Sequence, residues 1–550
     1  MKLNTLQINK SKFLTSVPTL LLIGVVLLLL FLPSISFGQD PTGAATGTVK
    51  DLGIDTVAAS KDTTLNKVVA TVNTIGNADG HNKIAINIMW TLITGFLVMF
   101  MQAGFALVET GFTQKKNVAH TMAMNFLIYV IGLLGFWICG FAFMFGGVGA
   151  VGALGGTPGL THEFSVHLFG HDFGLWGNAG YFLSSKVYDV GIFALFLFQM
   201  VFMDTTATIP TGAMAERWKF KSFVIFGFFI SMFVYPIFGN WVWGGGWLSQ
   251  LGVNFGLGHG HVDFAGSSVV HMVGGVAALA GAMVIGPRIG KYGKDGKVNT
   301  IPAHNIPMAL LGCFILAFGW FGFNPGSTLA GSDLRISIIA VNTMLASASG
   351  AVIAALYMKA KTDKWDPGMM ANGMLAGLVA ITAPCAFVNA TSAVIIGAIS
   401  GLFVIWAYFF IDTKLKIDDP VGAIAVHGVN GFWGVLSLGL FADGSYGDGW
   451  NGVPGTVKGL FYGDANQFLA EFIGGTVCFA FVFSVMYVFF KICKATIGLR
   501  SSEADEIGGL DIPEMGVHGY YDGDVIEEPR QVKPTGAGVL GYADPDKPKG

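Results

Sequence analysis

The segments DFAGSSVVHMVGG (residues 263–275) and DPVGAIAVHGVNG (residues 419–431) decide the fold of this chain. Both match the pattern D-x-x-G-x-x-x-V-H-x-V-x-G, and each opens a long apolar stretch. Their histidines, His271 and His427, stand eight residues after the aspartate that begins each segment. Such a pair indicates an internal duplication, and the apolar stretches around it indicate helices within a membrane.

The composition predicts the same class of protein. Of the 550 residues, 53% are hydrophobic and 12% are charged, and that charged share is about half the value for a soluble domain. The formal net charge of -3 gives no sign of a nucleic-acid partner. The five cysteines form no C-x-x-C pair, so we expect small core residues and neither disulfides nor metal ligands. They are Cys139, Cys313, Cys385, Cys478 and Cys493.

Long apolar segments recur with short breaks over most of the chain. At a rise of about 1.5 Å per residue, each is long enough to cross a hydrocarbon core of about 30 Å. The sequence therefore predicts an all-α membrane protein with eleven transmembrane helices. The eighth and ninth are separated only by a few residues around Ala390. The predicted spans lie near 87–113, 119–145, 188–214, 220–243, 264–287, 304–324, 335–359, 368–387, 390–412, 419–442 and 465–493.

Lysine and arginine residues set the expected orientation, because cytoplasmic connections of membrane proteins carry an excess of them. They gather after every odd-numbered span, from Lys115 and Lys116 after the first to Arg500 after the last. The other connections hold almost none, with Lys186 and Arg335 as exceptions. We therefore expect the chain to start outside and its C-terminus to lie inside.

The matching segments open the fifth and tenth spans, so the repeating unit is five spans. An odd number means that the copies cross in opposite directions, which gives two inverted five-helix repeats plus a final helix. Eight residues of helix rise about 12 Å, close to half of a core of about 30 Å, so His271 and His427 should meet near the middle of the membrane. Asp263 and Asp419 are expected to cap these helices.

The two ends of the chain differ from the apolar middle. Residues 1–38 have basic residues, an apolar run and small residues, which predicts a cleaved signal peptide, although an uncleaved extra span is an alternative. Residues 39–85 are polar and predict an extracytoplasmic, weakly structured extension. The transmembrane domain should cover 86–495. A cytoplasmic tail, 496–550, should be disordered from about residue 524.

A histidine pair within a membrane usually marks a pathway or a proton relay. It could bind a metal, transfer a proton or hydrogen-bond a small polar solute. Metal is disfavoured, because zinc-like sites need three or four ligands and none is obviously placed beside the pair. A relay or a solute contact is therefore expected.

Aromatic and hydroxyl residues in the outer-to-middle part of one span and at the outer ends of two others suggest a cationic solute. They are Phe202 in span three, Trp243 at the end of span four, and Ser327 after span six. Aromatic faces attract a cation such as ammonium, and a serine hydroxyl can accept one of its N–H bonds. For Trp243 alone, an interfacial aromatic belt is the alternative.

Taken together, these motifs resemble the ammonium transporter (Amt/Rh) family, on its Amt side. The resemblance covers roughly residues 87–521. Its motifs are Phe198-Gln199, Ala213 to Arg217, Val242 to Gly246, Asp263 to His271, His304 to Pro307, Gly319 to Ser327, Asp418 to His427 and Gly498 to Arg500.

The resemblance implies a role for each matching residue. Phe202, Trp243 and Ser327 would form an outer recruitment site, and Phe202 and Phe323 would stack below it as a gate. By the same resemblance, His271 and His427 would be the twin histidines beneath the gate, and Trp320 would line the lumen beside them. Asp263 would support the recruitment site. Asp419 is a structural support through its expected role as a helix cap.

The resemblance also implies partners and a location. Gly509-Leu510-Asp511 and His518 to Tyr521 are similar to the family's cytoplasmic tail motif, which couples the subunits of a homotrimer. We expect a multi-pass protein of the cell (inner) membrane, in contact with the lipid bilayer, with a possible PII-type signal protein at its cytoplasmic face. No cofactor is implied.

The implied function is ammonium transport. Ammonium would be recruited outside and deprotonated, and ammonia would pass the histidines with associated proton transfer. An ammonium sensor and an Rh-like neutral gas channel are the alternatives. Trp243 and Ser327 disfavour the gas channel, and the lack of a long fused soluble domain disfavours the sensor. No nucleophile or metal set accompanies the histidines, so we do not expect an enzyme.

Three further polar features fall outside this scheme. Asp204 lies within span three, where it could be functional or a packing residue at a subunit contact. Glu109 is interpreted as a helix-end residue facing water. His259 and His261, in a glycine-rich connection after span four, are interpreted as part of a plain loop, with weak metal binding as the alternative.

Overall fold

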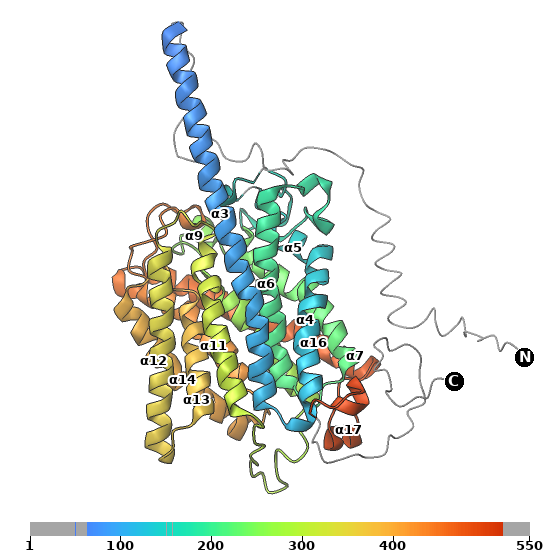
Figure 1. Ribbon diagram of the computed structural model, residues 1–550. Coiled ribbons are helices and arrows are strands. Elements are labelled where there is room, and N and C mark those ends of the chain that lie inside the picture. Colours follow the sequence, from blue (N-terminus) through green and yellow to red (C-terminus); the bar gives the residue numbers. More distant parts are fainter. Residues whose placement is uncertain (1–49, 51–62, 150, 157, 521–550) are drawn as a thin grey trace, which may run out of the picture.

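Ten helices long and apolar enough to cross a membrane run through the described part of the chain, which is thus a multi-pass membrane protein (Figure 1). The computed structural model describes residue 50 and residues 63–149, 151–156 and 158–520. The predicted signal peptide, most of residues 39–62 and the tail beyond residue 520 lie outside these ranges. Helices suit a membrane because each satisfies its backbone hydrogen bonds internally.

The bundle is built from eleven helical segments that follow one another along the chain. Two of them continue through a wide π-turn, at Phe136–Gly140 and Ile230–Val234. The helices are α3 (Thr63–Phe112), α4 (Val118–Gly135) with α5 (Phe141–Phe145), α6 (Val190–Met214), α7 (Phe220–Phe229) with α8 (Tyr235–Trp243), α10 (Val273–Ile285), α11 (Ile306–Phe323), α12 (Ile336–Thr362), α13 (Pro367–Ile381), α14 (Ala390–Phe410), α15 (Asn430–Phe441) and α16 (Ala465–Thr496).

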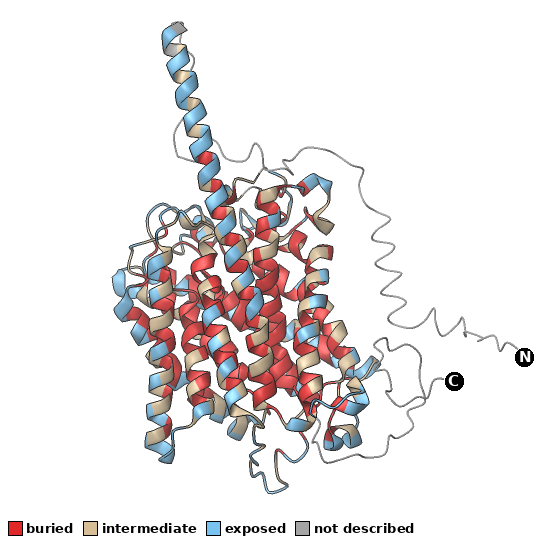
Figure 2. Cartoon of the chain, in the orientation of Figure 1, coloured by how far each residue is buried: buried red, intermediate tan, exposed pale blue. Residues whose placement is uncertain are grey.

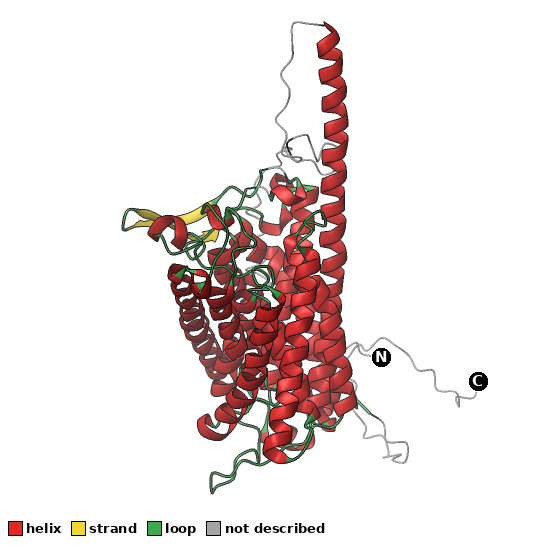
Figure 3. Ribbon diagram, turned by 90° about the vertical axis from the view of Figure 1, so that its left-hand side faces the viewer, coloured by secondary structure: helices red, strands yellow, loops and turns green. Residues whose placement is uncertain are grey.

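The arrangement places α10 in the interior of the bundle, where it contacts α6 and α16. On one side α3 packs along α11, and α12, α13 and α14 pack together. Two short helices, α9 (Leu251–Phe255) and α17 (Glu503–Gly508), lie outside the bundle. A hairpin of β1 (Glu163–Leu168) and β2 (His171–Gly177) projects at the end opposite α17 (Figures 1 and 3).

Exposed residues lie on the outside of the bundle and buried residues within it (Figure 2). Many of the exposed side chains are large and apolar, and many polar side chains are buried. Phe126 is 74% exposed, Phe314 68% and Trp406 63%. A soluble protein rarely leaves such a surface open to water, so this pattern fits contact with lipid. All five cysteines are free and buried, which confirms that they are core residues.

The first helix is longer than the sequence predicted. Because α3 begins at Thr63, residues 63–85 are helical, and the prediction of a weakly structured extension is wrong for them. Extending an existing helix adds one hydrogen bond for each residue fixed, whereas starting one is costly. The polar part of α3 therefore continues the membrane helix without a new nucleus.

The eighth span is shorter than predicted. It was expected over 368–387, but α13 ends at Ile381, and its 15 residues rise only about 22 Å. The chain turns there because its backbone bonds elsewhere: Thr382 O accepts the Ala265 N–H and Ala383 O accepts the Phe264 N–H. The described residues thus hold ten long helices and one shorter apolar helix, in place of eleven long ones.

The fifth and tenth spans also begin later than predicted. Their helices start with π-turns at Ser267–Met272 and Ile424–Val429. Before each turn, Gly266 and Gly422 have φ of +117° and +81°, a left-handed conformation open to glycine. The eight residues before each histidine are therefore not a continuous α-helix, and the 12 Å estimate of their rise does not apply.

Candidate functional site

The aromatic residues predicted for the path form a continuous series of ring contacts. The rings of Phe202 and Phe323 are stacked, with centroids 4.1 Å apart and planes at 20°. Trp243 meets Phe202 edge-on at 6.2 Å. On the other side, His271 stacks on Phe323 at 5.3 Å and on His427 at 5.2 Å. The series therefore joins the end of α8 to both segments that share the D-x-x-G-x-x-x-V-H-x-V-x-G pattern.

A cavity of about 250 Å³ lies at the Trp243 end of this series. Phe202, Trp243, Asp263 and Ser327 all line it, so the structure brings the predicted outer-site residues together. The Ser327 hydroxyl donates to the Phe323 carbonyl oxygen at 2.8 Å, which leaves its own oxygen free to accept.

Gln199 is a further lining residue, which the sequence analysis quoted only as part of a motif. Its Oε1 is buried and has no hydrogen-bond partner among the described residues. Buried amide oxygens are usually paired, so this one is available to a donor in the cavity. A polar residue on an apolar helix was the signal that could have identified it.

Asp263 holds the start of the π-turn that carries His271. Its Oδ1 accepts the N–H groups of Gly266 and Ser267, both at 2.8 Å. Its Oδ2 accepts those of Ser268 and Val269 and also the Ser268 hydroxyl. These bonds satisfy the N–H groups that a helix start leaves without partners, in agreement with the predicted cap.

The two histidines are in direct contact, as the repeat predicted. Their Nδ1 atoms are 3.2 Å apart, so one ring donates to the other. The Nε2 atom of His271 is buried without a hydrogen-bond partner in the described part of the chain. Trp320 stacks on His271 at 5.2 Å and donates its indole N–H to Thr382 Oγ1. Trp320 thus borders the pair, as predicted.

Close backbone contact between the two segments that carry the histidines allows this approach. A Cβ atom placed on Gly275 would lie 2.1 Å from the backbone nitrogen of Gly428. Only a glycine at position 275 lets the two segments come so near, as small residues do at membrane helix contacts.

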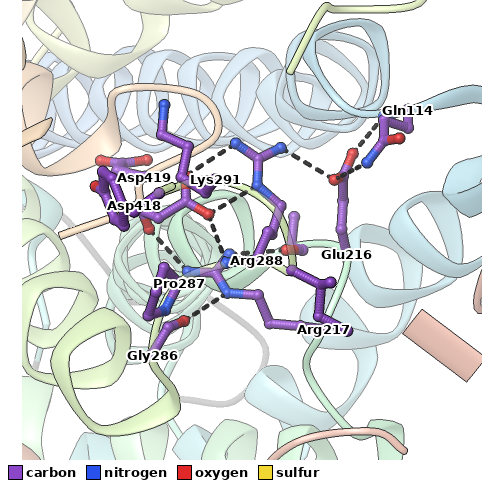
Figure 4. Close-up of polar contacts among 12 residues, drawn as sticks. Gln114, Glu216, Arg217, Gly286, Pro287, Arg288, Lys291, Asp418 and Asp419 are labelled. Atoms are coloured by element: carbon purple, nitrogen blue, oxygen red, sulfur yellow. Dashed lines mark hydrogen bonds and ion pairs between the residues drawn. The ribbon is translucent and has the colours of Figure 1, made fainter. Parts of the chain in front are cut away.

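Asp418, which directly precedes the segment 419–431, lies in a polar cluster at the end of the bundle opposite the cavity (Figure 4). The Arg288 guanidinium donates to both Asp418 oxygens, at 2.8 and 2.9 Å, and to Glu216 Oε2 at 3.0 Å. Glu216 accepts the backbone and side-chain N–H groups of Gln114. The cluster ties together the ends of α3, α6 and α10, and it precedes the π-turn of His427.

Asp419 caps that π-turn, as predicted. It accepts N–H groups from Val421 and Gly422 through Oδ1 and from Ile424 through Oδ2. Positive charge stabilises the ionised form of the neighbouring Asp418 carboxyl group. Burial raises its pKa, but the charge of Arg217 and the hydrogen bonds from Arg288 outweigh this and hold the pKa of Asp418 below its usual range.

The described part of the tail packs against the same end. Leu510 donates its N–H to Asn117 Oδ1, and Asp511 Oδ1 accepts the His120 N–H, both at 2.9 Å. Arg500 donates to the carbonyl oxygens of Ile285 and Pro287. These contacts place the predicted tail motif on the ends of α4 and α10.

Two interpretations of single polar residues need correction. Glu109 is 3% exposed and accepts hydrogen bonds from Asn125 and Thr211, so the prediction that it faces water is wrong. Its helix end is covered by α4 and α6, which the sequence of one helix does not reveal. His261 is 0% exposed and 2.7 Å from Glu471, so its loop is not a plain one.

Asp204 is buried within α6, and its Oδ1 has no hydrogen-bond partner among the described residues. It does not line the cavity beside Trp243.

Comparison with known proteins identifies the family. The sequence model described as "Ammonium Transporter Family" matches residues 89–520, well over half of the chain. The chain belongs to the ammonium transporter family. The predicted resemblance is thereby confirmed, and the family is one of membrane transporters, not of enzymes.

Individual members of the ammonium transporter family are also similar to this chain. "Ammonium transporter Amt2" of Archaeoglobus fulgidus is 46% identical over 440 residues, which cover 80% of this chain and 89% of that protein. A solved structure named "Sensor Amt Protein" has a TM-score of 0.67 and 38% identity, covering 79% of this chain and 99% of that one. Mep2 of Candida albicans has a TM-score of 0.65 and 26% identity, covering 81% and 92%.

Proposed function

We propose that this protein is an ammonium transporter that recruits ammonium in the outer cavity, deprotonates it, and passes ammonia along the histidine pair with associated proton transfer. One observation supports this most strongly. The cavity, the stacked rings of Phe202 and Phe323, and the paired His271 and His427 form one unbroken series of contacts.

Recruitment rests on the walls of the outer cavity. The aromatic faces of Trp243 and Phe202 attract a small cation, at about 0.5–2 kcal/mol per contact. Ser327 Oγ and Gln199 Oε1 supply acceptors for its N–H groups. Ammonium is a cation with four donors and no acceptor, so it matches this set of groups.

Deprotonation is proposed at the phenylalanine pair. The stack of Phe202 on Phe323 separates the cavity from His271 by apolar surface. A cation that enters such surroundings without hydrogen bonds loses solvation free energy on the order of 10 kcal/mol or more. Neutral ammonia loses far less, so the stack selects for proton loss.

The histidine pair then carries the next step. Between the two Nδ1 atoms only one proton is held, so the pair can move a proton by exchanging tautomers. The unpartnered Nε2 of His271 offers a hydrogen bond to ammonia or a place for the separated proton. Trp320 borders this part of the path through its ring contact with His271.

The proposed topology is eleven spans in two inverted five-helix repeats plus a final helix. The chain starts on the outer side of the inner membrane, and its C-terminus lies on the cytoplasmic side. It counts α13 as a span completed by the turns after Ile381. Support comes from the cluster at Gln114, Glu216, Arg288 and Asp418, where the ends of the first, third and fifth spans meet the start of the tenth.

A homotrimer with a PII-type regulator at the cytoplasmic face remains part of the proposal. The docked tail supports it, because Asp511 and Leu510 hold the tail against α4 and thus offer an ordered surface. Chemical cross-linking in the membrane would test the trimer, with three-subunit species as the expected result.

Currents on a supported membrane test the proposed function. Proteoliposomes adsorbed on an electrode would receive a pulse of ammonium, with a matched potassium pulse as the control. We expect a transient charge movement with ammonium and none with potassium. Ammonia uptake without charge would instead indicate a neutral gas channel, and binding without either would indicate a sensor.

A sensor is the second candidate function. The 38% identical structure named "Sensor Amt Protein" supports it, because that likeness covers nearly the whole of the named protein. A sensor and a transporter could share the outer cavity and differ only in conduction. The current measurement therefore separates them directly.

A further inference from the structure

A buried pair of ionisable groups, His261 and Glu471, lies against the outer cavity and has no part in the mechanism above. Both side chains are 0% exposed, and His261 Nδ1 lies 2.7 Å from Glu471 Oε2. His261 lines the cavity, whereas Glu471 lies behind it on α16. The pair therefore has one member at the substrate and one member in the bundle.

The hydrogen bonds around His261 fix where its ring carries protons. Four backbone N–H groups donate to Asp263, so its carboxylate acts as an acceptor, and the Ser268 hydroxyl also donates to it, at 2.7 Å. The single hydrogen of Ser268 is thus used. The contact of His261 Nε2 with Ser268 Oγ at 2.9 Å then requires a proton on Nε2.

The other ring nitrogen faces a carboxylate. Glu471 Oε1 already accepts the Val262 N–H at 2.9 Å and the Gln467 side-chain N–H at 2.7 Å. The contact of 2.7 Å between Nδ1 and Oε2 lacks the alignment of a hydrogen bond, so it is an ion-pair contact. With Nε2 protonated, a second proton on the ring makes His261 a cation beside the Glu471 carboxylate. Without that proton, the Nδ1 lone pair would lie 2.7 Å from a carboxylate oxygen in a buried site.

We propose that His261 and Glu471 share one proton and that this pair tunes the ammonium affinity of the outer cavity with pH. This inference rests on the proposed function. In its ionic form the pair has its positive end at the cavity and its negative end on α16. Loss of the proton leaves a net negative charge beside the cavity, which strengthens cation binding.

The surroundings of His261 determine the direction in which its pKa shifts. The charged groups that act on the ring are Glu471 from α16 and Asp263 from its own connection. Asp263 also interacts electrostatically with Tyr235 of α8 and Cys478 of α16. Burial alone would lower the pKa of His261, but the charge and hydrogen bond of Glu471 reverse this, and the pKa is raised.

The sign of the effect follows from that direction. His261 keeps its positive charge above the usual histidine pKa of about 6.5 and loses it as pH rises further. Ammonium remains a cation over this range. The half-saturating ammonium concentration should therefore fall with rising pH, by about tenfold, since one charge within roughly 10 Å changes affinity by about that factor at an effective dielectric constant near 20.

The test compares wild type, Glu471→Gln and the control His259→Gln. His259 lies in the same connection, but its Nε2 contacts the Gly455 carbonyl oxygen and not Glu471. Ammonium currents would be recorded from the full chain in proteoliposomes between about pH 6 and pH 8.5, a range that begins below the usual histidine pKa of about 6.5 and extends above it. The half-saturating ammonium concentration and the maximal current are measured separately. A defect that is only structural lowers the maximal current equally at every pH.

We expect the fall of the half-saturating ammonium concentration with rising pH to be lost in Glu471→Gln and retained in His259→Gln. A fall that is unchanged in Glu471→Gln would overturn the proposal. Infrared difference spectra of the purified protein over the same pH range give a readout independent of transport. A pH-dependent carboxyl or imidazole band that is present in the wild-type spectra and absent from those of Glu471→Gln supports the shared proton. This result would stand even if no ammonium current is found and the proposed function fails.

Discussion

Replacing Gly275 with alanine should separate the two histidines. An added Cβ would lie 2.1 Å from the Gly428 nitrogen and 2.5 Å from its Cα, whereas ordinary contact begins at 3.4 Å. The two segments must therefore move apart by 1.3 Å (3.4 − 2.1). If this displacement reaches the side chains, the contact of His271 with His427 lengthens from 3.2 to 4.5 Å (3.2 + 1.3), beyond hydrogen-bond reach.

Two measurements follow from this displacement. Overpacking should reduce stability by about 1–3 kcal/mol, seen as a lower thermal unfolding midpoint in detergent. Misplacement of transferring groups by about 1 Å should lower the ammonium current by on the order of tenfold to a hundredfold.

Gly428→Ala is the matched control. Its Cβ would lie 3.4 Å from the Gly275 carbonyl carbon and 3.6 Å from its oxygen, which is ordinary contact. This variant should keep most of the current and the stability. A Gly275→Ala protein with wild-type current and unfolding midpoint would refute the reasoning, as would equal damage by both variants.

Three further predictions concern single side chains. Trp243→Leu should raise the half-saturating ammonium concentration by roughly 2- to 30-fold, because a cation–π contact of about 0.5–2 kcal/mol is lost; an unchanged value in a current titration would exclude that contact. Phe323→Ala should remove the stack with Phe202 and open the cavity toward His271, so a potassium current should arise beside the ammonium current; retained selectivity would show that the stack is not the barrier. Asp418→Asn should lower stability at pH 7 by about 1–3 kcal/mol, because Arg288 loses one of its two buried carboxylate partners and keeps Glu216. Since the pKa of Asp418 is lowered in the folded protein, its contribution is full above the unfolded pKa of about 3.9 and is lost as pH falls below it, so the unfolding midpoints of variant and wild type should converge in acid.

The histidine pair could be predicted because the same sequence pattern occurs twice in the chain. The repeated pattern around His271 and His427 predicted their contact without any knowledge of the helices between them. The geometric argument was nevertheless inexact, because Gly266 and Gly422 adopt left-handed backbone conformations and the helices begin after them. Convergence depends on equivalent placement in the two copies, which the repeat supplies, and not on an ideal rise.

Features set by tertiary contacts could not be predicted. Glu109 lies near a helix end in sequence, but α4 and α6 cover it, and only the packed structure shows Asn125 and Thr211 as its partners. His261 and Glu471 are 210 residues apart (471 − 261), and neither lies in the repeated pattern around the histidines. A single polar residue on an apolar helix carries no signal for its partner.

Helix ends were the other limit. The polar residues 63–85 gave no apolar period, yet they continue α3 because the helix already exists below them. The end of α13 was missed for a different reason, since the backbone of Thr382 and Ala383 bonds to the connection that precedes His271. Hydropathy measures apolar length and does not detect such competition for hydrogen bonds.

The most direct test of the central claim is the ammonium-evoked current of a protein in which His271 and His427 are both replaced by leucine. Proteoliposomes with equal amounts of folded wild-type and variant protein would be compared with ammonium and potassium pulses on the same supported membrane. If the pair carries the proton that ammonium releases, the selective charge movement of the wild type should disappear in the variant. A variant that still moves charge with ammonium and still excludes potassium would contradict the account.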